Sequence, residues 1–318
     1  MIVEAHLTPD ERRAALEADA RSGLVATPKR LSPVWFYDER GSGLFDEITR
    51  LPEYYPTRCE RALLRAHAAE IAELTGADTL VELGSGTSEK TRVLLDVLRP
   101  TRYVPLDVDA DTLAQAASAL TKEYPGLDVH ALAADFHRHL DRLPAGGRRL
   151  VAFLGGTIGN LRPEERAGFL AEMRSCLDDD DWLLLGADLV KDVSRLEAAY
   201  DDASGVTAAF NRNALTVVNR ELDADFEPGR FEHVARWVPD AAWIEMRLRA
   251  RVAHKVTIGA LDLVLAFEEG EELLTEISAK FEVDGLTREL AEAGIEVVRA
   301  WVHGDDDFSL ILARPRSR

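Results

Sequence analysis

A Gly-x-Gly turn follows a short apolar stretch at residues 81–86, Val-Glu-Leu-Gly-Ser-Gly. Glycines let a ligand approach the backbone closely, and the start of a following helix offers free N–H groups. A dinucleotide fingerprint would carry a third glycine, but Ser88 and Glu89 stand in that neighbourhood, which argues against NAD. Taken alone, the turn is equally explained by a cofactor site and by a plain tight turn.

Acidic residues follow the next two predicted strands, where open α/β sheets bind their ligands. Asp107 is expected to accept hydrogen bonds from both ribose hydroxyls, and Asp135 from an adenine amino group while Phe136 packs on the base. Considered alone, either acid could instead be a helix cap or a solvated loop residue. With the Glu-x-Gly-x-Gly turn, the usual first motif of class I methyltransferases, the three features together indicate a site for S-adenosylmethionine.

Asn160 follows the fourth predicted strand, where class I methyltransferases place groups that face the methyl acceptor. Its side chain offers both a donor and an acceptor. Spacing alone explains it equally well as a turn residue ahead of a helix that begins at Pro163. No group of His, Cys and carboxylate residues has the spacing of metal ligands, so we expect no metal.

A doubly wound α/β domain is predicted to position these residues. Apolar strands are expected at 79–83, 103–106, 127–131, 149–154 and 182–187, with helices at 59–75, 88–98, 110–124 and 163–177. Strands without a polar face are typical of a parallel sheet covered on both sides. A helix at 285–293 and strands at 296–302 and 308–312 are expected to return to this parallel sheet.

The pattern changes after residue 191. Helices are expected at 192–201 and 208–222, and the segment 244–252 alternates apolar with charged residues. Such alternation indicates an antiparallel sheet with one packed and one wet face, and 256–267 is predicted as the partner strand. The amino-terminal segment has a helix at 8–22 and then aromatic residues among prolines and glycines. These aromatics form either a lid or, more commonly, an anchor between loop and core.

Seven sequence runs extend over almost the whole chain: 35–38, 51–58, 82–86, 188–192, 199–202, 210–213 and 275–281. They resemble the histidine-specific methyltransferase family of ergothioneine biosynthesis, and they include the insertion, which generic methyltransferases lack. The resemblance implies trimethylation of the α-amino group of free L-histidine by S-adenosylmethionine, giving hercynine. The change of pattern after residue 191 predicts a class I methyltransferase (cofactor-binding) domain at 59–190 plus 281–318 and an α+β domain at 1–58 plus 191–280, and the resemblance implies that the second domain binds the substrate.

Site residues follow from the same resemblance. The cofactor positions are Gly84, Lys90, Asp107, Asp135 and Phe136. The substrate positions are Tyr54, Asn160, Tyr200, Glu276, Ile277 and Ser278, with Asn160 and Tyr200 on the carboxylate and Glu276 and Ser278 on the imidazole. If their segment is extended, Glu276 and Ser278 share one face, which suits two acceptors or donors for the two ring nitrogens. Without the resemblance, Glu276 would be taken as a solvated charge.

The amine must be neutral to attack a methyl group, and the matching motifs contain no histidine base. Tyr37 lies near the amine by resemblance. The phenols of Tyr37 and Tyr54 are therefore predicted to relay the proton with water, while the sulfonium disfavours the ammonium form. The alternatives are a class I methyltransferase for another small amine or amino acid, and a non-catalytic module that binds S-adenosylmethionine.

The chain has 38 Lys and Arg against 57 Asp and Glu, a net charge of −19. A field of that sign argues against nucleic acid or an anionic membrane surface as a partner. Residues 1–13 lack the apolar core of a signal peptide, and no apolar run approaches the length of a membrane span. We expect a cytoplasmic monomer. The acidic runs 178–181, 268–272 and 305–307 are expected to be solvated surface.

Overall fold

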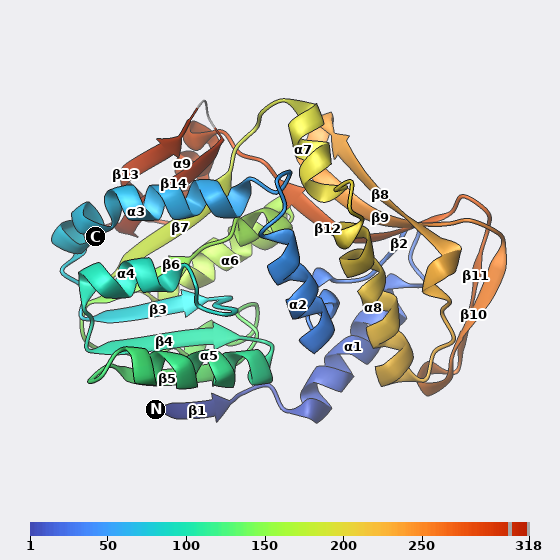
Figure 1. Ribbon diagram of the computed structural model, residues 1–318, viewed down its shortest axis with the longest axis horizontal. Helices are drawn as coiled ribbons and strands as arrows, with labels where there is room; N and C mark the ends of the chain where they lie inside the picture. Colours follow the sequence, from blue (N-terminus) through green and yellow to red (C-terminus); the bar gives the residue numbers. More distant parts are fainter. Residues whose placement is uncertain (305–306, 317–318) are drawn as a thin grey trace. The chain divides into compact units, whose positions relative to one another are not determined.

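The computed structural model describes residues 1–304 and 307–316, and the chain divides into two compact units (Figure 1). Unit 1 comprises Met1–Leu7, Pro56–Lys191 and Ala279–Arg318, and unit 2 comprises Thr8–Tyr55 and Asp192–Ser278. The first seven residues belong to unit 1, whereas the predicted division had joined them to the other part of the chain. Residues 305, 306, 317 and 318, which that division included, lie outside the described part. None of the described helices is long and apolar enough to cross a membrane.

Unit 1 is built on an eight-stranded sheet in the order β1-β5-β4-β3-β6-β7-β14-β13. The strands are β1 (Ile2–Ala5), β3 (Thr79–Leu83), β4 (Arg102–Asp107), β5 (Asp128–Ala133), β6 (Arg149–Phe153), β7 (Trp182–Asp188), β13 (Ile295–His303) and β14 (Phe308–Pro315). Strands β1 to β7 of this sheet pair in parallel. The last two return to the sheet as predicted, but their pairings are antiparallel: β14 pairs with β7, and β13 forms a hairpin with β14.

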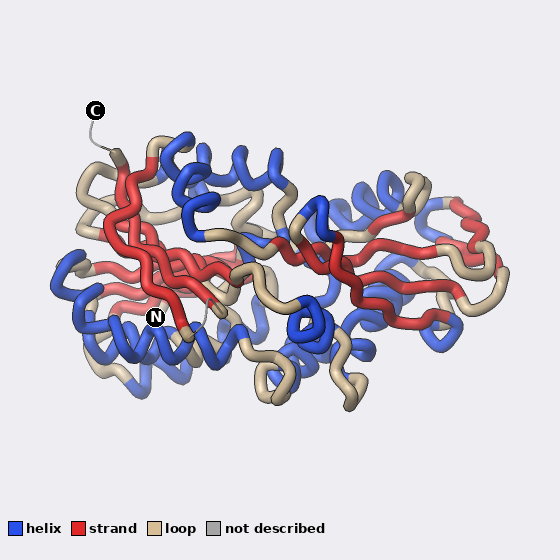
Figure 2. The backbone as a smooth tube through the Cα atoms, turned by 90° about the horizontal axis from the view of Figure 1, so that it is seen from above, coloured by secondary structure: helices blue, strands red, loops and turns tan. Residues whose placement is uncertain are grey.

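Helices cover both faces of this sheet (Figure 2). They are α3 (Pro56–Thr75), α4 (Thr91–Leu98), α5 (Ala110–Glu123), α6 (Pro163–Cys176) and α9 (Val283–Glu292). Helix α5 begins after Asp109, whose carboxylate accepts hydrogen bonds from the N–H groups of Asp111 and Thr112. Helix α4 begins three residues later than predicted, because Ser88 has a φ of 54° and cannot continue a right-handed helix.

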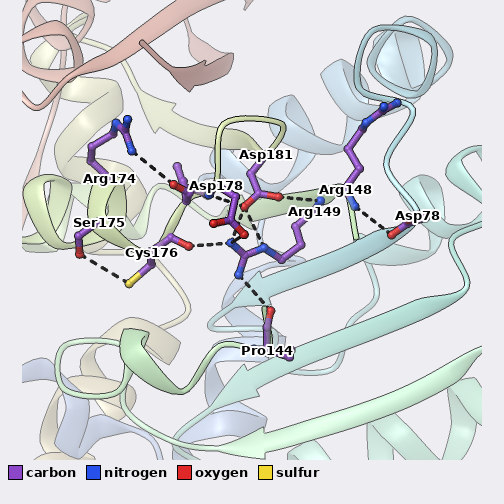
Figure 3. A network of polar contacts seen from close by, with 10 residues as sticks. Asp78, Pro144, Arg148, Arg149, Arg174, Ser175, Cys176, Asp178 and Asp181 are labelled. Carbon is purple, nitrogen blue, oxygen red and sulfur yellow. Dashed lines mark hydrogen bonds and ion pairs between the residues drawn. The ribbon is translucent and has the colours of Figure 1, made fainter. Parts of the chain in front are cut away.

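A buried ion pair joins the amino ends of β6 and β7 (Figure 3). Arg149 is 2% exposed and Asp181 is fully buried. The guanidinium donates to the Asp181 carboxylate and to the carbonyls of Pro144, at 3.0 Å, and Cys176, at 2.7 Å. Asp178, largely exposed, lies 3.4 Å from the same guanidinium. Asp181 is therefore a structural residue, and the prediction that the run 178–181 is solvated throughout is wrong.

Replacing Asp181 with alanine is expected to lower the free energy of unfolding by about 3–5 kcal/mol, because the Arg149 guanidinium would remain buried without its counter-charge. The pair lies at the amino ends of the strands, so ligand binding at their carboxyl ends should be unchanged in the folded variant. Urea denaturation measures the effect, with the exposed Asp180→Ala as the matched control. Equal stabilities for the two variants would contradict the structural role.

Unit 2 contains a four-stranded sheet in the order β2-β12-β9-β8 and a separate hairpin. The strands are β2 (Lys29–Arg30), β8 (Phe231–Val238), β9 (Trp243–Ala250) and β12 (Glu272–Ala279), with β10 (His254–Ile258) and β11 (Leu263–Phe267) in the hairpin. The helices are α1 (Pro9–Gly23), α2 (Glu39–Ile48), α7 (Val193–Tyr200) and α8 (Val206–Leu222). The prediction that 256–267 pairs with β9 is wrong, because this segment folds back on itself at the tight turn of residues 259–262.

Strand β9 has the predicted packed face, with Ile244, Met246, Leu248 and Ala250 all nearly inaccessible. It ends at Ala250, however, so Val252 is exposed, and Glu245 on the face predicted to be wet is buried. Its opposite face carries ion pairs. Glu272 of β12 contacts Arg249 at 2.8 Å and Arg236 at 3.2 Å, and Glu271 pairs with Lys29. Half-buried Glu271 and Glu272 therefore stabilise the sheet, which corrects the expectation that the run 268–272 is entirely solvated. In the third acidic run, residues 305 and 306 lie outside the described part, and Asp307 is only 14% exposed.

Candidate cofactor and substrate sites

The glycine turn after β3 is open above its backbone. Gly84 and Gly86 have φ values of 68° and 50°, and a Cβ added to either would meet nothing within 4 Å. The N–H groups of Gly84 and Ser85 donate to the Leu106 carbonyl at 2.8 and 3.1 Å, which fastens the turn to β4. The turn therefore combines a fixed backbone with room for a ligand, as a cofactor site requires.

Asp107, the last residue of β4, holds the same turn. One carboxylate oxygen accepts from the Gly86 N–H at 2.8 Å and the other from the Asp109 N–H at 3.1 Å. Burial raises the pKa of Asp107, while these two hydrogen bonds oppose the rise. Each carboxylate oxygen can accept a further hydrogen bond, so the carboxylate can serve ribose hydroxyls while it positions the turn.

Asp135 and Phe136 follow β5, as predicted. The Asp135 carboxylate accepts from the His137 N–H at 2.9 Å, which orders the loop. The Phe136 ring makes an edge contact with Phe153 at a centroid distance of 5.2 Å and is half-buried. Both residues therefore lie at the carboxyl edge of the sheet with Gly84 and Asp107, where an adenine could contact them.

Lys90 has a partner that sequence reasoning missed. Its ammonium pairs with Glu60 of α3, which is fully buried. The second oxygen of Glu60 accepts from the Gly155 N–H at 2.7 Å. Glu60 thus connects the residue before α4 to the loop after β6. The only sign of this buried role in the sequence is the position of Glu60 on the apolar side of a helix, beside Cys59, Leu63 and Leu64.

A buried carboxyl group lies directly under the glycine turn. Glu82 of β3 accepts from the Tyr103 hydroxyl at 2.6 Å and from the Thr91 hydroxyl, and Tyr103 also bonds Ser88 at 2.9 Å. Burial raises the pKa of Glu82 to about 7, although both hydroxyls and Lys90 lower it. Glu82 is therefore partly protonated near neutral pH and links β3, β4 and the start of α4.

The raised pKa of Glu82 predicts a pH-dependent stability. The folded protein holds the proton up to about pH 7, whereas an unfolded Glu loses it near 4.5, so stability falls as the pH rises between these values. The free energy of unfolding should drop by about 3 kcal/mol more in the wild type than in Glu82→Gln over this range. Urea titrations at pH 5 and pH 8 test this, with exposed Glu89→Gln as the control. A Glu82→Gln protein with the wild-type pH slope would contradict it.

Asn160 ends a 3-10 turn, η3 (Thr157–Asn160), in the loop after β6. A Cβ on Gly159 would lie 2.7 Å from the carbonyl oxygen of Ala279, which also belongs to unit 1, so glycine is required at this close approach. Asn160 is half-buried and belongs to unit 1, whereas Tyr37, Tyr54, Tyr200, Glu276, Ile277 and Ser278 belong to unit 2.

The predicted tyrosines of unit 2 are linked by one row of aromatic rings. Tyr37 packs on Phe45 with centroids 5.8 Å apart, Phe45 on Tyr54 at 6.2 Å, and Tyr54 on Tyr200 at 6.3 Å. Phe210 of α8 lies 5.4 Å from Tyr37 and anchors the row. Within unit 2 this packing favours the interpretation that the amino-terminal aromatics anchor loops to a core.

The residues expected to recognise histidine meet at the end of α7 and on β12. The hydroxyl groups of Tyr200 and Ser278 lie 2.7 Å apart, and both residues are buried. Strand β12 is extended, so Glu276 and Ser278 share a face, as predicted. Ile277 is buried on the opposite face, so any contribution to the same ligand would come from its backbone. The Tyr200 carbonyl accepts from His233, which sequence reasoning missed.

Within residues 1–304 and 307–316, one group could offer three ligand atoms to a metal: Cys59, His303 and Asp307, whose ligand atoms lie within 4.8 Å of one another. They come from α3, the end of β13 and the turn that follows it, a combination that sequence spacing could not reveal. None of them is a predicted site residue. A closed structural zinc site uses four protein ligands, so we do not assign a metal site to these three residues.

The family model described as "Histidine-specific methyltransferase, SAM-dependent" matches residues 16–315. The chain belongs to this family. It is an S-adenosylmethionine-dependent methyltransferase, which confirms the predicted methyl donor and family. Histidine N-alpha-methyltransferase of Mycolicibacterium smegmatis is 56% identical over 312 residues, 97% of each chain, and that of Mycobacterium tuberculosis is 55% identical over 315 residues, 98% of each.

The fold also has a counterpart among solved structures. An S-adenosylmethionine-dependent methyltransferase from Clostridium acetobutylicum matches 86% of this chain and 99% of its own, with a TM-score of 0.51 and 10% identity. At that identity the likeness concerns the fold alone. Together with the parallel order of β1 to β7, it confirms the predicted class I methyltransferase architecture.

Proposed function

We propose that this enzyme trimethylates the α-amino group of free L-histidine to give hercynine, a step of ergothioneine biosynthesis. The observation that carries the proposal is the buried Tyr200–Ser278 hydroxyl pair, with Glu276 on the same face of β12. The names of the mycobacterial relatives support the same substrate. A carboxylate and two linked hydroxyls provide the acceptors and donors that an amino acid with an imidazole ring needs.

The hydroxyl pair constrains how histidine can bind, because only one of the two groups donates in their shared hydrogen bond. If Tyr200 donates its proton to the substrate carboxylate, Ser278 must donate to Tyr200. The Ser278 oxygen then accepts from an imidazole N–H, and Glu276 accepts from the other ring nitrogen when that nitrogen is protonated. An N–H left without an acceptor would cost about 1–3 kcal/mol, which disfavours side chains of other shapes. Asn160 is proposed as the second ligand of the carboxylate.

The cofactor residues are proposed to hold the adenosine part of S-adenosylmethionine. Asp107 would bind the ribose hydroxyls, Asp135 the adenine amino group, and Phe136 the face of the base. Gly84 leaves the space for this approach, and Lys90 fixes the turn through Glu60. When bound, the cofactor supplies an electrophilic methyl group on a sulfonium.

Transfer of that methyl group is proposed to be an in-line SN2 displacement, so the protein's main contribution is to orient a neutral amine. Tyr37 and Tyr54 are the proposed proton relay to water. Their rings are held in place by Phe45, which fixes the directions of the phenol groups. Ring faces in this row can also accommodate the fixed positive charge of a trimethylated product.

Titration calorimetry with S-adenosylhomocysteine present tests the substrate assignment. Binding of histidine, with weaker binding of amino acids that lack an imidazole, is the expected result. Preferential binding of another amine would support the second candidate, a class I methyltransferase for another small amine or amino acid. A protein that binds S-adenosylhomocysteine but no amino acid would be a non-catalytic module, and the proposal would fail.

We further propose that the enzyme works in the cytoplasm as a monomer, without a nucleic-acid or membrane partner. The net charge of −19 supports this, because it repels polyanions and favours solubility. Light scattering coupled to size-exclusion chromatography would give a mass near 35.2 kDa for a monomer. A mass twice as large would contradict it.

A further inference from the structure

His233 lies outside every sequence run that carries the family resemblance, yet it contacts a proposed substrate residue. It lies on β8 in register with Leu248 of β9, and its side chain is buried. Its Nε2 atom is 2.7 Å from the carbonyl oxygen of Tyr200, and its Nδ1 atom is 2.9 Å from Nδ2 of Asn211. Three elements, β8, α7 and α8, therefore meet at this imidazole.

The surrounding hydrogen bonds determine which nitrogen of His233 carries the proton. Nδ2 of Asn211 also lies 3.1 Å from the carbonyl oxygen of Arg247, and only the nitrogen of the amide can donate there. The opposite amide orientation would place two oxygens at that distance. The second N–H of Asn211 then points at Nδ1 of His233, which must accept. The proton is therefore on Nε2, and Nε2 donates to Tyr200.

The bond from His233 reaches the backbone at the carboxyl end of α7. Tyr200 is the last residue of α7, and the final carbonyls of a helix have no intrahelical donor. His233 holds the backbone of Tyr200 at this point, and Ser278 holds its hydroxyl. The position of one proposed substrate ligand is thus fixed at both ends.

We propose that His233, in its neutral Nε2–H form, is a positioning residue for substrate recognition: it holds the backbone of Tyr200 so that the Tyr200 hydroxyl stays aligned for the substrate carboxylate. This inference rests on the proposed function. His233 does not act as a base, because both ring nitrogens are engaged within the protein. It acts on the substrate only through Tyr200.

Protonation of His233 would break this arrangement, because Nδ1–H would face an N–H of Asn211. Burial lowers the pKa of His233, and Arg212 lowers it further, while the Tyr200 carbonyl, Asp201 and Asp202 raise it. Asp201 is exposed, with its carboxylate 3.9 Å from Nε2. The balance keeps the imidazole neutral in the pH range in which the enzyme's amine substrate is deprotonated, so Tyr200 stays positioned there.

The test is the affinity for histidine measured by calorimetry with saturating S-adenosylhomocysteine. His233→Leu is expected to weaken histidine binding about tenfold and to leave the affinity for S-adenosylhomocysteine unchanged. His233→Gln keeps an N–H donor for the Tyr200 carbonyl and should restore most of the loss. Because His233 acts through Tyr200, His233→Leu combined with Tyr200→Phe should bind histidine no more weakly than Tyr200→Phe alone.

These measurements distinguish a failure of the proposed function from a failure of the positioning role of His233. If the wild type binds no histidine, the proposed function fails. If the wild type binds histidine and His233→Leu binds it equally well, or if the two substitutions are additive, the positioning role is overturned. If His233→Leu does not fold, nitrogen NMR of histidine-labelled wild type decides, with the His233 signal assigned by its loss in His233→Gln. An Nε2–H tautomer supports the role, and an Nδ1–H tautomer or an imidazolium at pH 7 overturns it.

Discussion

Asp107→Ala is expected to raise the dissociation constant for S-adenosylhomocysteine by about 10²- to 10³-fold. Two contributions add in the same direction. The variant loses the proposed charge-assisted hydrogen bonds to the ribose, each worth about 1.5–3 kcal/mol. It also loses the anchor of the glycine turn, because the Gly86 N–H donates to this carboxylate at 2.8 Å.

Asp111→Ala is the matched control, because Asp111 is an exposed acid in the first turn of α5, only four residues away. Its affinity for S-adenosylhomocysteine should equal that of the wild type. Asp107→Asn should fall between the two, since an amide oxygen retains part of the acceptor capacity. Unchanged binding in Asp107→Ala would show that the carboxyl edge of β4 does not hold the cofactor.

Tyr200→Phe is expected to lower kcat/KM for histidine by about 10²-fold, mainly through KM. The ring and its packing on Tyr54 remain, so the change removes only the hydroxyl. Its loss deprives the substrate carboxylate of a donor and leaves Ser278 without the partner it has at 2.7 Å. The affinity for S-adenosylhomocysteine should stay the same.

A double-mutant cycle with Ser278→Ala tests whether the two hydroxyls work as a pair. The double variant should lose much less than the sum of the single losses, because each single change already interrupts the same hydrogen-bond chain. Tyr124→Phe, which removes a hydroxyl bonded to Asp96 at 2.8 Å, is the control for a hydroxyl with no proposed role in binding. Additive losses for Tyr200 and Ser278 would contradict the linked arrangement.

The features that sequence predicted best are local or follow from a general rule of the fold. The positions of Gly84, Asp107 and Asp135 follow from the rule that ligands bind at the carboxyl ends of parallel strands. Apolar runs of five or six residues were enough to locate β3 and β6. The pairing of Glu276 with Ser278 on one face required only that β12 be extended.

The features that sequence missed depend on contacts between distant segments. Glu60 reaches Gly155, 95 residues away, and Asp181 reaches Arg149, 32 residues away. His233 lies on an apolar face of β8, and its proposed role follows only from its contacts with the end of α7 and with Asn211 of α8. Nothing in the local pattern separates such residues from ordinary surface acids or core histidines.

Strand partners were the other source of error. Alternation in 244–252 identified the buried face of β9, but alternation says nothing about which strand lies beside it. The lengths and positions of the turns between the strands determine which strands pair. β8 and β9 are joined by a short turn and form a hairpin, whereas 256–267 contains a turn of its own.

Trimethylation of histidine is measured directly by incubating the protein with S-adenosylmethionine and each free amino acid in turn and determining the product masses by mass spectrometry. We expect trimethylated histidine, hercynine, as the dominant product, with little or no methylation of the other amino acids. Absence of trimethylated histidine, or faster methylation of a different amino acid, would contradict it.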